Sequence, residues 1–123
     1  MTEAIIGCAY TVHNTLGGGF AESVYERSLA IELRAAGYFV ETQINIPVRY
    51  RDQPVGDFVG DALVERRVLC ELKAVEAFAK AHEVQLVNYL QATGIDVGLL
   101  INFGPHSVSI KRKTRLRGHC ESR

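Results

Sequence analysis

The 123-residue chain carries 14 lysines and arginines against 14 aspartates and glutamates, so no net field draws it to nucleic acid or to a membrane. This length, with 47% hydrophobic residues, predicts one globular domain over residues 1–123. Its 3 cysteines are odd in number and lack CxxC spacing, which argues against a disulfide framework and a zinc site. We expect reduced thiols and a cytoplasmic protein, because no leader or membrane-span pattern is present.

Two helices are predicted before the first strand. Apolar residues spaced three and four apart indicate a helix over residues 2–16. Gly17-Gly18-Gly19 should end it, because each glycine destabilises a helix by about 1 kcal/mol relative to alanine. A second helix is expected over residues 21–36, closed by Gly37 in the C-cap position.

From residue 38 the pattern changes from helical to alternating, which predicts a strand. A turn at residues 51–54 should lead to a second strand over residues 55–64, and a three-residue turn at 65–67 to a third over residues 68–75. These strands would form a three-stranded meander. Six residues of the first strand should share one face: Val40, Thr42, Ile44, Ile46, Val48 and Tyr50.

A crossover helix and two further strands complete the prediction. The helix should cover residues 78–93 and end at Gly94. The apolar strand over residues 97–103 should be covered on both faces, an edge strand should follow over residues 107–113, and residues 118–123 should form a frayed tail. The predicted fold class is α/β, with a central mixed sheet flanked by helices.

Three charged residues on the second and third strands are the most informative feature of the chain: Asp61, Glu71 and Lys73. Strand side chains alternate between faces, so Glu71 and Lys73 point the same way. A three-residue turn would place Asp61 directly opposite Glu71, whereas a two-residue turn would place Asp61 on the other face. Two carboxylates can bind a hard divalent cation, and a nearby lysine can stabilise the charge that develops when a phosphodiester is hydrolysed.

Two helical segments add to this pattern: Gly19-Phe20-Ala21-Glu22-Ser23-Val24-Tyr25 and His82-Glu83-Val84-Gln85-Leu86-Val87-Asn88-Tyr89-Leu90. With them the sequence resembles, over nearly its full length, the small GxxExxY proteins of the PD-(D/E)XK nuclease superfamily. The resemblance implies a restriction-endonuclease-like core and a nuclease that uses Mg²⁺ or Mn²⁺ and acts on nucleic acid, with DNA the expected substrate. The proline of the family name has no counterpart, because Gly60 precedes Asp61.

The resemblance also implies roles for individual residues. Asp61 and Glu71 would bind the metal, with the backbone carbonyl of Leu72 and the Glu22 side chain as further ligands. Lys73 would orient the attacking water, and Gln85 would order the site as a fourth catalytic residue. Three other side chains would support the site: Tyr25, Tyr89 and His82.

Ordinary structural explanations stand beside these roles. Glu71 and Lys73 could form an ion pair on a solvated face, and Glu22 could favour the positive end of its helix. Tyr25 and Tyr89 are more often core aromatics than catalytic groups.

The end of the chain carries a basic run: Lys111, Arg112, Lys113 and Arg115. Such a run could follow a nucleic-acid backbone, or its charges could protect an edge strand from pairing. The small size of the domain favours a homodimer or a larger complex. The alternative function is a non-catalytic module that retains the nuclease fold and binds nucleic acid or a protein partner.

Overall fold

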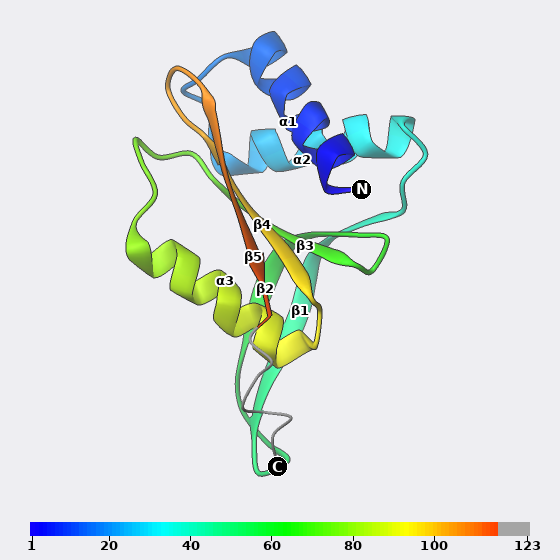
Figure 1. Ribbon diagram of the computed structural model, residues 1–123, viewed down its shortest axis with the longest axis vertical. Coiled ribbons are helices and arrows are strands. Elements are labelled where there is room, and N and C mark those ends of the chain that lie inside the picture. The colour runs from blue at the N-terminus through cyan, green and yellow to red at the C-terminus, as the bar shows by residue number, and fades with distance from the viewer. Residues whose placement is uncertain (116–123) are drawn as a thin grey trace.

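The computed structural model describes residues 1–115 (Figure 1). The sheet has the order β1-β2-β3-β4-β5, in which β3 and β4 are parallel and the other neighbours are antiparallel. The predicted α/β class, with a mixed sheet and a crossover helix, is confirmed, while the predicted tail at 118–123 lies outside the described residues. The elements in chain order are α1 (Thr2–Leu16), α2 (Glu22–Ala35), β1 (Val40–Tyr50), β2 (Gln53–Val64), β3 (Val68–Lys73), α3 (Lys80–Thr93), β4 (Val97–Phe103) and β5 (Val108–Thr114).

Helices cover both faces of the sheet, with α1 and α2 together on one side and α3 on the other (Figure 1). Tyr25 of α2 and Leu72 of β3 belong to the core under α1 and α2. Leu86 of α3 and Leu69 of β3 belong to the core under α3. Because both faces are covered, β4 is buried along nearly its whole length, as predicted. No helix within residues 1–115 is long and apolar enough to cross a membrane.

Helix ends follow from local hydrogen bonding. At the end of α2 the Tyr38 N–H donates to the Leu33 carbonyl and the Gly37 N–H donates to the Arg34 carbonyl, which is a Schellman motif. Gly37 has a φ of 96°, the left-handed conformation this motif requires. Gly37 was predicted as the C-cap, whereas the C-cap is Ala36 and Gly37 is the next residue. The third helix begins two residues later than predicted, at Lys80.

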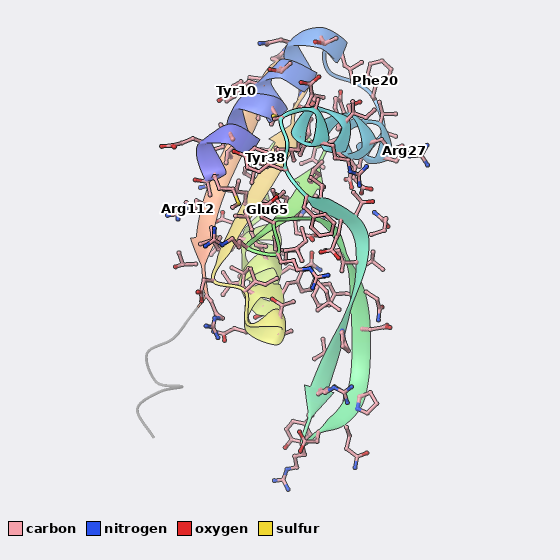
Figure 2. The ribbon with its side chains drawn as sticks, turned by 90° about the vertical axis from the view of Figure 1, so that its right-hand side faces the viewer. Tyr10, Phe20, Arg27, Tyr38, Glu65 and Arg112 are labelled. Atoms are coloured by element: carbon pink, nitrogen blue, oxygen red, sulfur yellow. The ribbon has the colours of Figure 1, made fainter. Side chains whose placement is uncertain are left out.

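The long hairpin of β1 and β2 extends away from the helices (Figures 1 and 2). Its predicted four-residue turn is wrong: Arg51 and Asp52 alone connect the strands, with φ of 52° and 64°, as in a type I′ turn. The second strand therefore begins at Gln53 and contains Pro54. Proline is tolerated there because β3 pairs only with the far end of β2, so one edge of β2 is free at this position.

The predicted common face along β1 is also wrong. Val40 belongs to the core under α1 and α2, whereas Ile46 belongs to the core under α3. Between them, Gln43 has a φ of 52°. This left-handed conformation is uncommon outside glycine, and it interrupts the regular alternation of side chains. The strand therefore presents its apolar residues to opposite faces on either side of Gln43.

A matching change of face occurs on β2 at Asp61, which is level with Gln43. Ala62 belongs to the core under α1 and α2, while a Cβ placed on Gly60 would lie 3.1 Å from Cδ1 of Ile46 on the opposite face. The pairing of β2 with β3 reaches only as far as Ala62. Asp61 therefore lies where the hairpin separates from the rest of the sheet.

Candidate active site

Asp61 and Glu71 lie together at this separation of β2 from β3. Val64 pairs with Val68 and Ala62 with Cys70, which confirms the three-residue turn and brings Asp61 level with Glu71. Beyond Ala62, hydrogen bonds to the Asp61 and Glu71 side chains replace the backbone hydrogen bonds between β2 and β3. The Asp61 N–H donates to Oε2 of Glu71 over 3.2 Å, and the Leu72 N–H donates to Oδ2 of Asp61 over 2.7 Å. These bonds fix both carboxylates in position.

The ionised forms of the two carboxylates are unfavourable in this position. Burial, with the nearby charge of Asp61, raises the pKa of the Glu71 carboxyl to about 8, although the Asp61 N–H and Lys73 act in the opposite direction. Burial also raises the pKa of Asp61, and the Glu22 charge adds to this, while the hydrogen bond from Leu72 and the Lys73 charge lower it. Lys73 therefore only partly offsets the negative charge, and a bound cation would stabilise the pair.

Helix α2, which covers the opposite face of the sheet from α3, brings two more carboxylates near the pair. The Glu22 side chain is exposed, and its charge raises the pKa values of Asp61 and Glu71. Burial raises the pKa of Glu26, one turn later, and Asp61 raises it further. Oε1 of Glu26 accepts a 2.6 Å hydrogen bond from Nε2 of Gln43.

Sequence reasoning missed Glu26 and Gln43. The four-residue spacing from Glu22 to Glu26, which places both on one face of a helix, was a usable signal for the first. No sequence signal marked Gln43, because its role depends on a backbone conformation imposed by the surrounding structure.

The donor set around Asp61 and Glu71 consists of oxygen atoms. Within residues 1–115, no three histidine, cysteine, aspartate or glutamate side chains converge into a ready-made metal cluster, so Glu22 is not brought together with the pair as a third direct ligand. Mg²⁺ suits two carboxylates, because it retains several waters and completes its coordination with substrate phosphate oxygens. The Leu72 carbonyl should point to the same side as the Leu72 N–H, toward Asp61, because both groups of a strand residue face one neighbour. These residues fit such an ion.

Helix α3 faces the pair with Tyr89. Burial raises the pKa of the Tyr89 hydroxyl, and the charges of Glu71 and Asp61 add to this, whereas a hydrogen bond with Gln85 lowers it. The Tyr89 ring stacks on Phe58 of β2. Gln85 is exposed on α3 and hydrogen-bonds to Tyr89. Tyr89 lines the same side of the sheet as Glu71.

His82 has a structural role at the start of α3. Its Nδ1 accepts a 3.0 Å hydrogen bond from the Ala79 N–H, which would otherwise lack a partner at the beginning of the helix. This bond also explains why α3 begins after the predicted position. Within residues 1–115, this hydrogen bond joins the His82 ring to the start of its own helix and not to the carboxylates, where a supporting role was expected.

Tyr25 lies in the core and not at the carboxylates. Its side chain is fully buried and stacks on Phe103 with ring centroids 4.6 Å apart. The hydroxyl donates to the Gly17 carbonyl over 2.6 Å and accepts a 3.2 Å bond from the Phe20 N–H. The residue predicted to support the site instead fixes the glycine-rich connection that positions α2.

Tyr25→Phe should lower the free energy of unfolding by about 1 to 3 kcal/mol, because the Gly17 carbonyl and the Phe20 N–H would lose their partner. Urea denaturation of the purified protein measures this. Tyr10→Phe is the matched control, since the Tyr10 side chain is 46% exposed, and it should have little effect. Equal stability of the two variants would contradict the assignment.

The basic run on β5 is largely paired within the protein. Nζ of Lys113 lies 2.7 Å and Nζ of Lys111 lies 3.8 Å from carboxylate oxygens of Glu83 on α3. Arg115 pairs with Asp96 over 2.9 Å. Strand β4 separates β5 from β3, so the run lies about 10 Å or more across the sheet from Glu71. The remaining member of the run, Arg112, is exposed.

Comparison with known proteins agrees with this architecture. The family model described as the PD-(D/E)XK nuclease superfamily matches residues 1–113. The crystal structure of SSO0001 superimposes with a TM-score of 0.59 at 16% sequence identity, over 80% of this chain and 52% of that chain. At this identity the likeness shows the fold alone, and the chain spans about half the length of that protein. Among curated proteins no sequence matches the chain.

Proposed function

The chain belongs to the PD-(D/E)XK nuclease superfamily, and on this basis we propose that it is a Mg²⁺- or Mn²⁺-dependent nuclease of the GxxExxY group that hydrolyses phosphodiester bonds, with DNA the first substrate to test. The observation that carries the proposal is the pair of buried carboxylates at the separation of β2 from β3. Asp61 and Glu71 are held by hydrogen bonds from the Asp61 and Leu72 N–H groups, and burial raises the pKa of both carboxyls. A metal ion would offset this cost.

In the proposed mechanism, Asp61, Glu71 and the Leu72 carbonyl would hold the ion, and Glu22 would act on it through water. When bound, the ion would polarise the phosphoryl oxygen and lower the pKa of a coordinated water. Lys73 points to the same side of β3 as Glu71, where its ammonium group would orient the attacking water and stabilise the charge that develops on the phosphate. Gln85 keeps the Tyr89 hydroxyl in place beside the carboxylates.

Cleavage assays on single- and double-stranded DNA and RNA, with Mg²⁺ or Mn²⁺ and with EDTA, test the proposal. We expect metal-dependent cleavage that Lys73→Met slows by at least about 10²-fold, the scale of losing one charge-stabilising group. Lys80→Met is the matched control, since Lys80 is exposed at the start of α3. A folded protein that cleaves none of the four substrates with either ion would refute the enzyme and favour the non-catalytic binding module.

The proposal includes a cytoplasmic location and a homodimer or larger complex. Cys8 and Cys70 are free thiols, and burial raises the pKa of Cys70 to about 12, so this thiol stays protonated and unreactive. A domain of this size covers only a short stretch of nucleic acid, which favours a second copy. Light scattering coupled to size-exclusion chromatography measures the assembly.

A further inference from the structure

A recess lies between α2 and β1 and is lined in part by Gln43. It has a volume of about 530 Å³. Most of its polar lining can donate hydrogen bonds, and Glu26 supplies the one carboxylate. We call it the arginine recess, and its polar residues are Ser23, Glu26, Arg27, Arg34, Thr42 and Gln43.

The arginine recess adjoins the candidate active site through Gln43 and Glu26. Gln43 is level with Asp61 across the β1–β2 ladder, where neighbouring strands are about 5 Å apart. The Gln43 amide donates to Glu26, whose pKa responds to the Asp61 charge. The left-handed φ of 52° at Gln43 is strained for a residue other than glycine, so the surrounding structure holds this residue in place. A nucleic-acid strand that passes Asp61 on the side of Gln43 would reach the recess next.

The two arginines give the recess the chemistry of a phosphate site. A guanidinium presents five N–H donors in a planar fork that matches phosphate oxygens. Nη2 of Arg34 donates to the Val40 carbonyl over 2.8 Å, which orients the side chain and leaves its other donors available. Arg27 projects outward from α2 (Figure 2). Glu26 repels anions and is hydrogen-bonded to Gln43. A phosphate in the recess would therefore bind at Arg27 and Arg34 and not at Glu26.

The alternative basic surface on β5 is less suited to this role. Lys111 and Lys113 pair with Glu83, and Arg115 pairs with Asp96. A phosphate would have to displace these carboxylates before binding. The arginine recess is also lined by Gln43, which is level with Asp61, whereas β5 is separated from β3 by β4.

We propose that the arginine recess binds the phosphate next to the scissile one in a single strand of nucleic acid. The proposal rests on the function proposed above and adds the class of substrate. A recess of this volume accepts a group the size of a small ligand, such as one nucleotide of a flexible strand. A base-paired duplex keeps both strands on a wide, stiff helix and cannot lay one nucleotide into it.

Binding of a fluorescein-labelled oligothymidylate, followed by anisotropy in EDTA, tests the arginine recess without any cleavage. Arg27→Ala should weaken binding by about tenfold, and the slope of log K against log salt should become shallower by about 0.7, the value for one phosphate contact on a single strand. Arg27→Lys should recover part of the affinity, because it retains the charge but not the fork. Unfolding temperatures of both variants should match the wild type, since Arg27 is exposed.

Controls separate this proposal from the nuclease assignment. Arg67→Ala removes an exposed arginine at the β2–β3 turn and should leave binding unchanged. Loss of affinity with Arg112→Ala but not with Arg27→Ala would overturn the arginine recess in favour of β5, and so would equal weakening of a hairpin duplex by Arg27→Ala. If the wild type cleaves while Arg27→Ala binds normally, phosphate binding by the recess is refuted and the nuclease function is supported. If nothing is cleaved but Arg27→Ala binds weakly, the recess is a phosphate-binding site for single strands, its position next to a scissile phosphate is refuted, and the nuclease assignment fails.

Discussion

Asp61→Asn should reduce metal-dependent cleavage by at least about 10²-fold while the protein remains folded. Oδ2 of Asp61 accepts the Leu72 N–H over 2.7 Å, and the amide oxygen of asparagine can accept the same bond. The substitution therefore keeps the geometry and removes one of the two anionic ligands. Initial rates at saturating Mn²⁺, measured beside isothermal titration of Mn²⁺ into the protein, should show both slower cleavage and weaker metal binding.

Asp57→Asn is the matched control for this substitution. Asp57 is on the same strand, four residues earlier, where the hairpin is exposed and β3 does not pair with it. Its cleavage rate should equal that of the wild type. Without metal, Asp61→Asn should also be at least as stable as the wild type, because the charge that raises the pKa of Glu71 is gone. Full cleavage activity of Asp61→Asn would remove Asp61 from the metal site.

In the metal-free protein, the free energy of unfolding should decrease by several kcal/mol as pH rises from about 4.5 to about 8. In the folded state burial and Asp61 raise the pKa of Glu71 from 4.5 to about 8. Between these values the folded protein keeps the Glu71 proton and the unfolded chain loses it. The stability this proton provides is therefore complete below about pH 4.5 and is lost as pH rises through about 8. Urea denaturation in EDTA across this range measures it.

Glu71→Gln and added metal give opposite checks on the pH dependence. Glutamine cannot ionise and can still accept the Asp61 N–H bond, so the variant should lose most of this slope. Saturating Mn²⁺ should stabilise the wild type more at pH 8 than at pH 5, because protons compete with the metal for the carboxylates. A wild-type profile as flat as that of Glu71→Gln would show that Glu71 is not protonated in the folded protein.

Local patterns predicted most of the fold. The helical spacing over residues 2–16, the glycines at Gly37 and Gly94, and the apolar strand over residues 97–103 correspond to α1, the ends of α2 and α3, and β4. The errors fall on the β1–β2 hairpin. There the two-residue turn and the left-handed Gln43 depend on positive φ values, and a strand pattern alone carries no information on φ.

The candidate site shows the same division. The spacing of Asp61, Glu71 and Lys73 predicted Asp61 opposite Glu71, and the register of β2 and β3, which reaches Ala62 opposite Cys70, agrees with that alignment. The helical assignments were less successful. Tyr25 is in the core, and His82 caps the start of α3, because each side chain satisfies backbone groups that only the folded chain brings within reach.

The sequence by itself determined the order of the elements, the turn that aligns Asp61 with Glu71, and the resemblance to a nuclease superfamily, because these depend on periodicity and spacing along the chain. Only the tertiary structure decided how the charges combine. It paired Lys111 and Lys113 with Glu83, brought Glu26 to Gln43, and placed Arg27 and Arg34 in a recess that Gln43 also lines. Electrostatic energies depend on distance and burial, and neither is fixed until the layers pack.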